Sequence, residues 1–202
     1  KSGKMLAWSL WKKVGVIGDS ETKPNYLFVN DFKSVADFDT MESGWADPEK
    51  VLSDMKLAAI ETNSISKVVA TYIMKTEAGI QGEPKFVVVN YAKPTNIQAF
   101  VDENKNLWKP FFEKEQKNGF KLNGWGLQTV VYPQGNDVPF SALTWDGFTK
   151  ISEALDHIQY RPSSQTRFAP IVKDSKMSTI TPNGFELSPI YELVMYVDAS
   201  TK

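Results

Sequence analysis

The single histidine of this chain, His157, is a candidate for presenting a polar group to a ligand. His157 follows Glu153 and Asp156 in a segment whose apolar residues have helical spacing, and Arg161 lies four residues further on. Residues at positions i and i+4 share one face of a helix, so the imidazole and the guanidinium could present a polar pair to a ligand. A histidine near the C-terminal end of a helix is also stabilised by the helix dipole without any function. A structural role for His157 is therefore the simpler interpretation.

Aromatic residues and the end of one expected strand supply the other candidates. Tryptophans on expected strands and on an expected helix could line a cavity between a sheet and its covering helices, although aromatic side chains dominate protein cores in general. Polar residues where a strand turns into a helix can face a site or simply form the turn. The candidate ligand-binding residues are Asn90, Tyr91, Trp108, Trp125, Trp145, His157 and Arg161. The sequence assigns no catalytic residue among them.

The composition excludes several kinds of chemistry. The chain has no cysteine and one histidine, which removes thiol nucleophiles, disulfides and thiolate zinc sites and leaves little for a histidine-rich metal site. It has no glycine-rich phosphate loop, no HExxH motif and no calcium-binding loop. We therefore expect no metal and no cofactor. With 23 basic and 24 acidic residues, the net charge of -1 gives no general reason to expect a nucleic acid or an anionic membrane as partner.

Length and hydropathy indicate a soluble protein with a sizeable core. A chain of 202 residues with 42% hydrophobic content can form one or two compact domains. Its longest apolar runs, such as residues 86–89, have the length of a strand and not of a membrane span. The chain begins at Lys1 without a signal sequence, so the sequence leaves both a cytoplasmic location and export with a removed signal open.

An internal similarity organises the chain. Residues 4–10 resemble residues 121–127, including the tryptophans at positions 8 and 125. In both places a turn with Gly and Asp follows, and then a second strand that ends in an aspartate, at residues 26–31 and 142–146. Short segments with helical spacing come next. The copies close with β-rich segments at 67–74 and 190–197, so the order strand, strand, helix, strand occurs twice.

Only the second copy has a preceding strand and helix. Residues 86–91 predict a strand, and Thr95-x-x-Gln98 predicts a capping box at the start of a helix that Gly119 ends. Pro110 predicts a kink or a break in that helix near Lys109. Two further segments are expected to differ between the copies. They are a helix start at Asp47-Pro48-Glu49 and an extended loop over residues 161–185.

The complete unit, β-α-β-β-α-β, is the ferredoxin-like arrangement. On this order of elements and on the two tryptophan segments, the chain resembles the dimeric α/β-barrel superfamily over residues 3–198. The resemblance implies an α+β fold of duplicated ferredoxin-like units, whose antiparallel sheets carry helices on one face. The first repeat would be residues 1–80 and the second residues 81–202. Because the first repeat lacks an equivalent of residues 85–119, we expect its front strand and helix to lie upstream of Lys1, the alternative being an incomplete repeat.

Three functions are compatible with these observations. The first is a protein that binds a small hydrophobic or aromatic ligand. The second follows from the resemblance, since the superfamily includes cofactor-independent monooxygenases that act on aromatic substrates. Asn90, Trp125, His157 and Arg161 would be the residues to mutate in that case. The third is a structural module that self-associates, for example as a homodimer.

Overall fold

The computed structural model describes residues 5–15, 24–40, 67–159 and 162–198. The chain divides into two compact units, described separately below. The first unit comprises residues 1–12, 17–71 and 194–202, and the second comprises residues 13–16 and 72–193. The expected helix start at Asp47-Pro48-Glu49 lies outside the described residues.

The first unit contains a β-hairpin. Strands β1 (Met5–Lys13) and β2 (Tyr26–Phe32) pair antiparallel, as their sequences predict, and a short 3-10 helix, η1 (Val35–Thr40), follows. Alternate residues of β1, Ala7 and Ser9, are buried, which is the pattern of a strand with one covered face.

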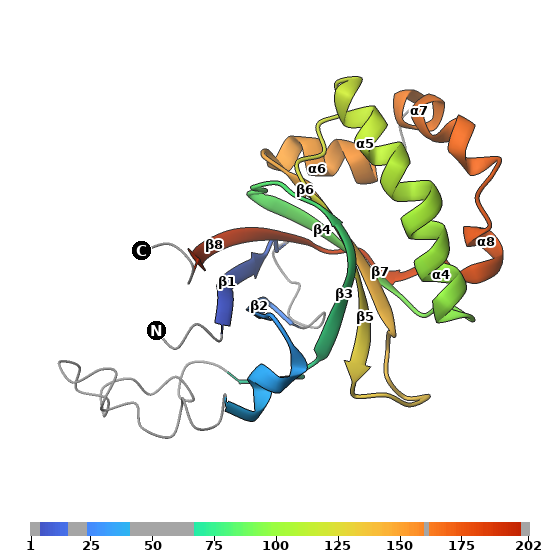
Figure 1. Ribbon diagram of the computed structural model, residues 1–202. Coiled ribbons are helices and arrows are strands. Elements are labelled where there is room, and N and C mark those ends of the chain that lie inside the picture. The colour runs from blue at the N-terminus through green and yellow to red at the C-terminus, as the bar shows by residue number, and fades with distance from the viewer. Residues whose placement is uncertain (1–4, 16–23, 41–66, 160–161, 199–202) are drawn as a thin grey trace. The chain divides into compact units, whose positions relative to one another are not determined.

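The second unit is built on a curled antiparallel sheet with helices on one face (Figure 1). Its strand order is β8-β4-β6-β5-β3, and the short strand β7 pairs with β4 beside β8. The strands are β3 (Ile73–Ile80), β4 (Phe86–Ala92), β5 (Trp125–Tyr132), β6 (Ala142–Phe148), β7 (Phe185–Leu187) and β8 (Ile190–Asp198), of which residues 190–193 belong to this unit.

The helical layer comes from four stretches of the chain. The first runs without interruption from α4 through a π-helical turn, η3, into α5, and the others form α6, α7 and α8 (Figure 1). Their bounds are α4 (Ile97–Glu103), η3 (Asn104–Trp108), α5 (Lys109–Lys117), α6 (Ile151–Ile158), α7 (Pro162–Val172) and α8 (Met177–Ile180). Among the described residues, no helix is long and apolar enough to cross a bilayer.

The long helix differs from its prediction in two ways: near Pro110 it has a π-helical turn and continues without a break, and its N-cap is not the predicted residue. A π-helical turn ends at Trp108, two residues before Pro110, whose missing N–H removes a donor from the helical ladder. Helix α4 begins differently from the prediction. Asn96, not Thr95, is the N-cap and accepts a hydrogen bond from the Ala99 N–H at 2.9 Å. The Thr95 hydroxyl donates instead to the Ile180 carbonyl at 3.2 Å.

Two other sequence predictions are wrong. Strand β3 begins at Ile73, whereas residues 67–71 are exposed and lie outside any strand. The expected loop at 161–185 is largely helical, because α7 and α8 occupy most of it. Pro162 stands at the start of α7, where its missing N–H has no helical partner to lose, and Ile171 is buried while Phe168 packs against the core.

The core of the second unit lies between the sheet and the helices. Trp125, Phe148 and Phe100 are its largest fully buried side chains, contributed by β5, β6 and α4. The protein is thus α+β with an antiparallel sheet, as expected. The duplication of a ferredoxin-like unit and its boundary at residue 80 stay predictions.

Candidate functional site

A short chain of polar side chains crosses the core of the second unit. Asn90 on β4 and Asp146 on β6 lie on the sheet face that bears the helices, with exposed fractions of 8% and 4%. The register of the two strands places them diagonally, because Asn90 is opposite Thr144 and Asp146 is opposite Val88. Buried polar groups are costly unless they are hydrogen-bonded, so the partners of these residues matter.

One carboxylate oxygen joins the members of this chain. The Asn90 Nδ2 amide donates to Oδ2 of Asp146 at 2.7 Å and to the Thr144 hydroxyl at 3.3 Å. Nε2 of His157 lies 3.4 Å from the same Oδ2. We call Asn90, Asp146 and His157 the polar chain. Its histidine and aspartate side chains are only 15% and 5% exposed.

Helix α6 directs His157 toward the sheet. The helix starts two residues after β6 ends, and Glu153 accepts a hydrogen bond from the Lys150 N–H at 3.0 Å, which stabilises its first turn. Ala154 is completely buried, and His157 follows it by three residues and therefore shares its face. Leu155 and Ile158, by contrast, are exposed.

Three phenylalanines enclose the imidazole. The ring of Phe148 on β6 lies 5.2 Å from it, that of Phe120 lies 5.7 Å away, and that of Phe168 on α7 lies 6.0 Å away, all between centroids. We call these rings the phenylalanine enclosure. Nδ1 of His157 is buried there and has no hydrogen-bond partner among the described residues. An imidazole that directs Nε2–H toward a carboxylate has a lone pair on Nδ1, so this nitrogen is an unused acceptor in an apolar environment.

A wider aromatic cluster surrounds this enclosure. Among the described contacts, Arg167 is the one cation beside these rings. Its guanidinium lies 5.0 Å from the centre of the Phe120 ring and forms an ion pair with Glu115 at 2.8 Å. The other members are Trp108, Phe111, Phe112 and Trp125, in contact with one another or with Phe168. The histidine is therefore next to a layer of packed aromatic rings.

The structure brings together some of the predicted site residues and separates others. Asn90 and His157 are joined through Asp146, and Trp108 and Trp125 lie in the same layer, where both contact Phe112 at 6.0 and 5.9 Å. Trp145 and Tyr91 point to the opposite face of the sheet, because their strand neighbours face the helices. Arg161 lies outside the described residues.

Trp145 and Tyr91, on the opposite face of the sheet, pack against neighbouring residues there. The indole of Trp145 occupies the space that a Cβ at Gly126 would need, and it also packs over Gly124. The ring of Tyr91 lies 4.6 Å from that of Phe140. Burial, assisted by the neighbouring hydroxyls of Tyr191 and Tyr72, raises the pKa of Tyr91, so that this phenol stays protonated.

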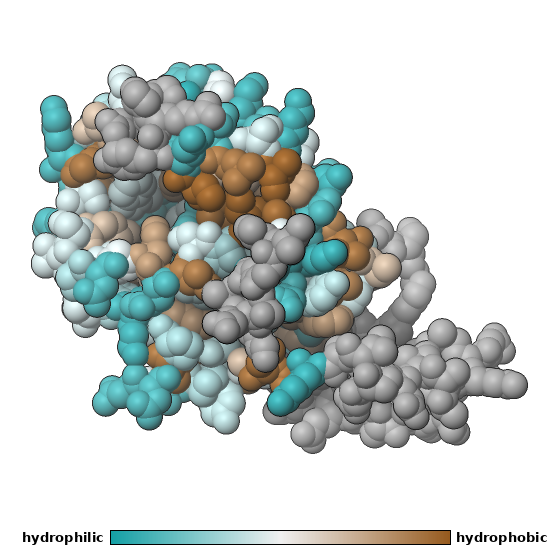
Figure 2. Space-filling model, turned by 180° about the vertical axis from the view of Figure 1, so that it is seen from behind, coloured by the Kyte–Doolittle hydropathy of each residue, from teal (hydrophilic) through white to brown (hydrophobic). Residues whose placement is uncertain are grey.

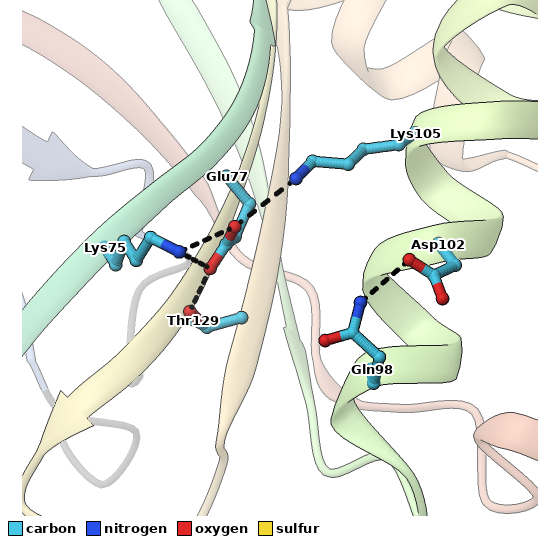
Figure 3. A network of polar contacts seen from close by, with 6 residues as sticks. All are labelled: Lys75, Glu77, Gln98, Asp102, Lys105 and Thr129. Atoms are coloured by element: carbon cyan, nitrogen blue, oxygen red, sulfur yellow. Dashed lines mark hydrogen bonds and ion pairs between the residues drawn. The ribbon is translucent and has the colours of Figure 1, made fainter.

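A second polar network connects β3, β5 and the π-helical turn (Figure 3). Glu77 lies at a bulge in β3, where its carboxylate accepts hydrogen bonds from Thr129 at 3.1 Å, Lys75 at 3.2 Å and Lys105 at 3.4 Å. Desolvation acts to raise the pKa of Glu77, but these hydrogen bonds and the charge of Lys75 outweigh it and hold the pKa below its usual value. Both carboxylate oxygens of Glu77 have hydrogen-bond partners, so we interpret this network as structural.

The surface carries exposed apolar side chains as well as charged ones. The space-filling view shows hydrophobic residues gathered in a patch among hydrophilic ones (Figure 2). In the second unit, Phe185 and Leu187 of β7 are 45% and 42% exposed. Self-association through such a surface stays a prediction.

Asp146 is the functional candidate that sequence reasoning missed as a site residue. Its signal was present, because each copy of the internal similarity has a second strand that ends in an aspartate. What the sequence did not show is the pairing of β4 with β6 that sets this aspartate beside Asn90. In the described parts of the chain, no three carboxylate or imidazole groups are gathered to hold a metal ion.

Comparisons with known proteins show a likeness of fold. No protein-family model matches the sequence, and no curated protein matches it. An anthrone oxidase-like protein of known structure aligns with 98% of this chain and 81% of its own, with a TM-score of 0.57 and 11% identity. A candidate monooxygenase from Fusobacterium nucleatum aligns with 97% of this chain and 79% of its own, with a TM-score of 0.52 and 13% identity. At this identity the comparison shows the fold alone: an α+β fold shared with proteins of monooxygenase type.

Proposed function

We propose that this protein is a monooxygenase-like enzyme that oxidises an activated methylene group on an aromatic compound, with His157 as the base and dioxygen as the oxidant. The observation that carries the proposal is the arrangement of His157: its buried Nδ1 has no hydrogen-bond partner among the described residues, its Nε2 faces Asp146, and aromatic rings surround the imidazole. The likeness of fold to an anthrone oxidase-like protein supports the choice of reaction and of test substrate.

The residues of the site divide the chemistry among them. Nδ1 of His157 takes one methylene proton, and the electron pair of the broken C–H bond stays on the substrate carbon. Asp146 faces Nε2 and stabilises the imidazolium that forms. The rings of Phe120 and Phe168, which are half-buried, would hold the aromatic part of the substrate by stacking.

The oxidation balances with one molecule of dioxygen. The carbanion gives its electrons to dioxygen and a carbon–oxygen bond forms, so that the substrate carries a peroxide. The proton held on His157 goes to the outer peroxide oxygen. Cleavage of the O–O bond, with loss of the second methylene hydrogen, gives a carbonyl and water. One CH2 group and one O2 thus yield one C=O group and one H2O.

Oxygen uptake with anthrone tests the proposal. The protein should consume one O2 per anthrone and form the quinone faster than buffer does, and His157→Gln should lower that rate about 100-fold or more, as expected for loss of a general base. Ser152→Ala, on the exposed side of the same helix, is the matched control and should retain the rate. Saturable anthrone binding without turnover would contradict the enzyme and favour a binding protein. A rate unchanged in His157→Gln would remove the histidine from the reaction.

A further inference from the structure

Asn90 is the member of the polar chain that is connected to His157 only through Asp146. It lies on β4, between β8 and β6 in the sheet, and is 8% exposed. Its amide donates to Asp146 and Thr144, and its link to His157 runs through the Asp146 carboxylate. Asn90 was expected from the sequence to touch a ligand, but its place behind Asp146 suggests a different role.

We infer that Asn90 is a positioning residue, which holds the Asp146 carboxylate so that His157 keeps its proton on Nε2 and presents an unprotonated Nδ1. The use of Nδ1 as a base rests on the proposed function. The tautomer itself does not depend on turnover and can be measured on the protein without substrate.

The donors and acceptors around one carboxylate oxygen determine the tautomer of His157. An ionised carboxylate only accepts hydrogen bonds, so both nitrogen atoms near Oδ2 of Asp146 must direct a hydrogen toward it. Nδ2 of Asn90 does so at 2.7 Å, and Nε2 of His157 faces the same oxygen at 3.4 Å. The proton of the neutral imidazole is then on Nε2, because Nδ1 has no hydrogen-bond partner in the described parts of the chain and the imidazole lies among three phenylalanine rings.

Both amide hydrogens of Asn90 have an acceptor, which fixes the orientation of its side chain. One is directed to Asp146, and the other to the Thr144 hydroxyl at 3.3 Å. Without these donors the buried carboxylate loses its shortest hydrogen bond. It would then gain by rotating away or by taking a proton, and a protonated carboxyl group can donate to Nε2. The imidazole would in that case carry its proton on Nδ1, where the base needs a lone pair.

Nitrogen NMR provides a direct test, because His157 is the one histidine of the chain and gives the one imidazole signal set. A long-range 1H–15N correlation spectrum of the neutral wild-type imidazole should show a protonated Nε2 and an unprotonated Nδ1. Asn90→Ala should shift the population toward Nδ1–H. Asn90→Val removes the same donor and suits a strand, so it provides a second variant should the alanine protein not fold.

Asn123→Ala is the matched control. Asn123 also makes side-chain hydrogen bonds between segments, to the Glu83 carbonyl and the Thr149 hydroxyl, but none of these contacts reaches the polar chain. A merely structural asparagine would change stability without changing the tautomer. The inference is overturned if the wild-type protein has its proton on Nδ1, which needs no variant. It is also overturned if folded Asn90→Ala or Asn90→Val keeps the wild-type tautomer.

Kinetics separates this inference from the proposed function. Since Asn90 does not reach the substrate, Asn90→Ala should lower kcat for anthrone and leave KM within about twofold. The expected NMR result on a protein that does not oxidise anthrone would uphold the positioning role and contradict the proposed function. Turnover by the wild-type protein, with an unchanged tautomer in the folded variant, would contradict the positioning role alone.

Discussion

Replacing Glu77 by Gln should destabilise the protein by an amount that depends on pH. The carboxylate of Glu77 is 12% exposed and joins the bulge of β3 to Thr129 on β5 and to Lys105 on the π-helical turn. The substitution keeps the shape of the side chain and removes its charge. Any difference in stability therefore reports the charged hydrogen bonds.

The size of the effect follows from the exposure of the partners. A hydrogen bond to a charged group contributes about 1.5–3 kcal/mol when buried, whereas an ion pair with an exposed partner contributes about 0.2–1 kcal/mol. The side chains of Lys75 and Lys105 are 65% and 39% exposed, so their share falls in the lower range. The neutral amide oxygen of Gln still accepts one hydrogen bond. We expect Glu77→Gln to lower the free energy of unfolding by about 1–2 kcal/mol at neutral pH.

The pH dependence has a definite sign. The pKa of Glu77 in the folded protein is lowered, mainly because hydrogen bonds and the charge of Lys75 outweigh desolvation. A lowered pKa stabilises the folded state fully above the unfolded pKa, about 4.3, and this stabilisation is lost as the pH falls through the folded value. The difference between wild-type and Glu77→Gln should therefore shrink toward zero in acid.

Urea unfolding followed by circular dichroism, at neutral pH and at decreasing pH, measures this difference. Glu113→Gln is the control, because Glu113 is 48% exposed and pairs with Lys109 along one helix at 3.6 Å. It should change stability by about 0.5 kcal/mol or less. Equal destabilisation by Glu77→Gln at neutral and at acid pH would refute the reasoning, since the effect would then come from packing and not from charge.

Three further substitutions test the packing on the two sides of the sheet. Gly126→Ala should displace the Trp145 indole and cost about 1–3 kcal/mol, with a changed tryptophan emission spectrum, because the new methyl group claims the volume of that ring. An unchanged spectrum and stability would contradict it. Phe148→Ala should cost about 3–5 kcal/mol in urea unfolding, since Phe148 is fully buried. Phe168→Ala should lower the free energy of unfolding by less, because that ring is half-buried, and should raise KM for anthrone. A loss of stability as large as that of Phe148→Ala, with no change in KM, would count against the place of Phe168 beside the substrate.

The antiparallel sheet with helices on one face could be predicted, because its signals are local. The strand at residues 86–91 is apolar and β-branched, and the segment from Ile151 to Ile158 has helical spacing, and both are found where expected. The Ser-, Thr- and Pro-rich segment at 161–185 was misjudged. Its composition is typical of a loop, yet burial of Ile171 and packing of Phe168 favour a helix there.

The candidate site could be predicted only in part. His157 and Asn90 were recognisable as unusual residues at the ends of expected elements. Their link is Asp146, which comes from a third element, and only the pairing of β4 with β6 sets it next to Asn90. The same alternation carries Trp145, the neighbour of Asp146 in sequence, to the other face of the sheet. Sequence showed that this strand had polar and aromatic residues, but not which of them shares a face with the histidine.

The most direct test of the account is hydrogen exchange of the anthrone methylene group in D2O without oxygen, followed by NMR. Removal of dioxygen isolates the proton transfer assigned to His157. The wild-type protein should exchange these hydrogens well above the buffer rate, His157→Gln should return the rate to that of buffer, and Ser152→Ala should retain it. Exchange by His157→Gln as fast as by the wild-type protein would contradict the assignment of His157 as the base.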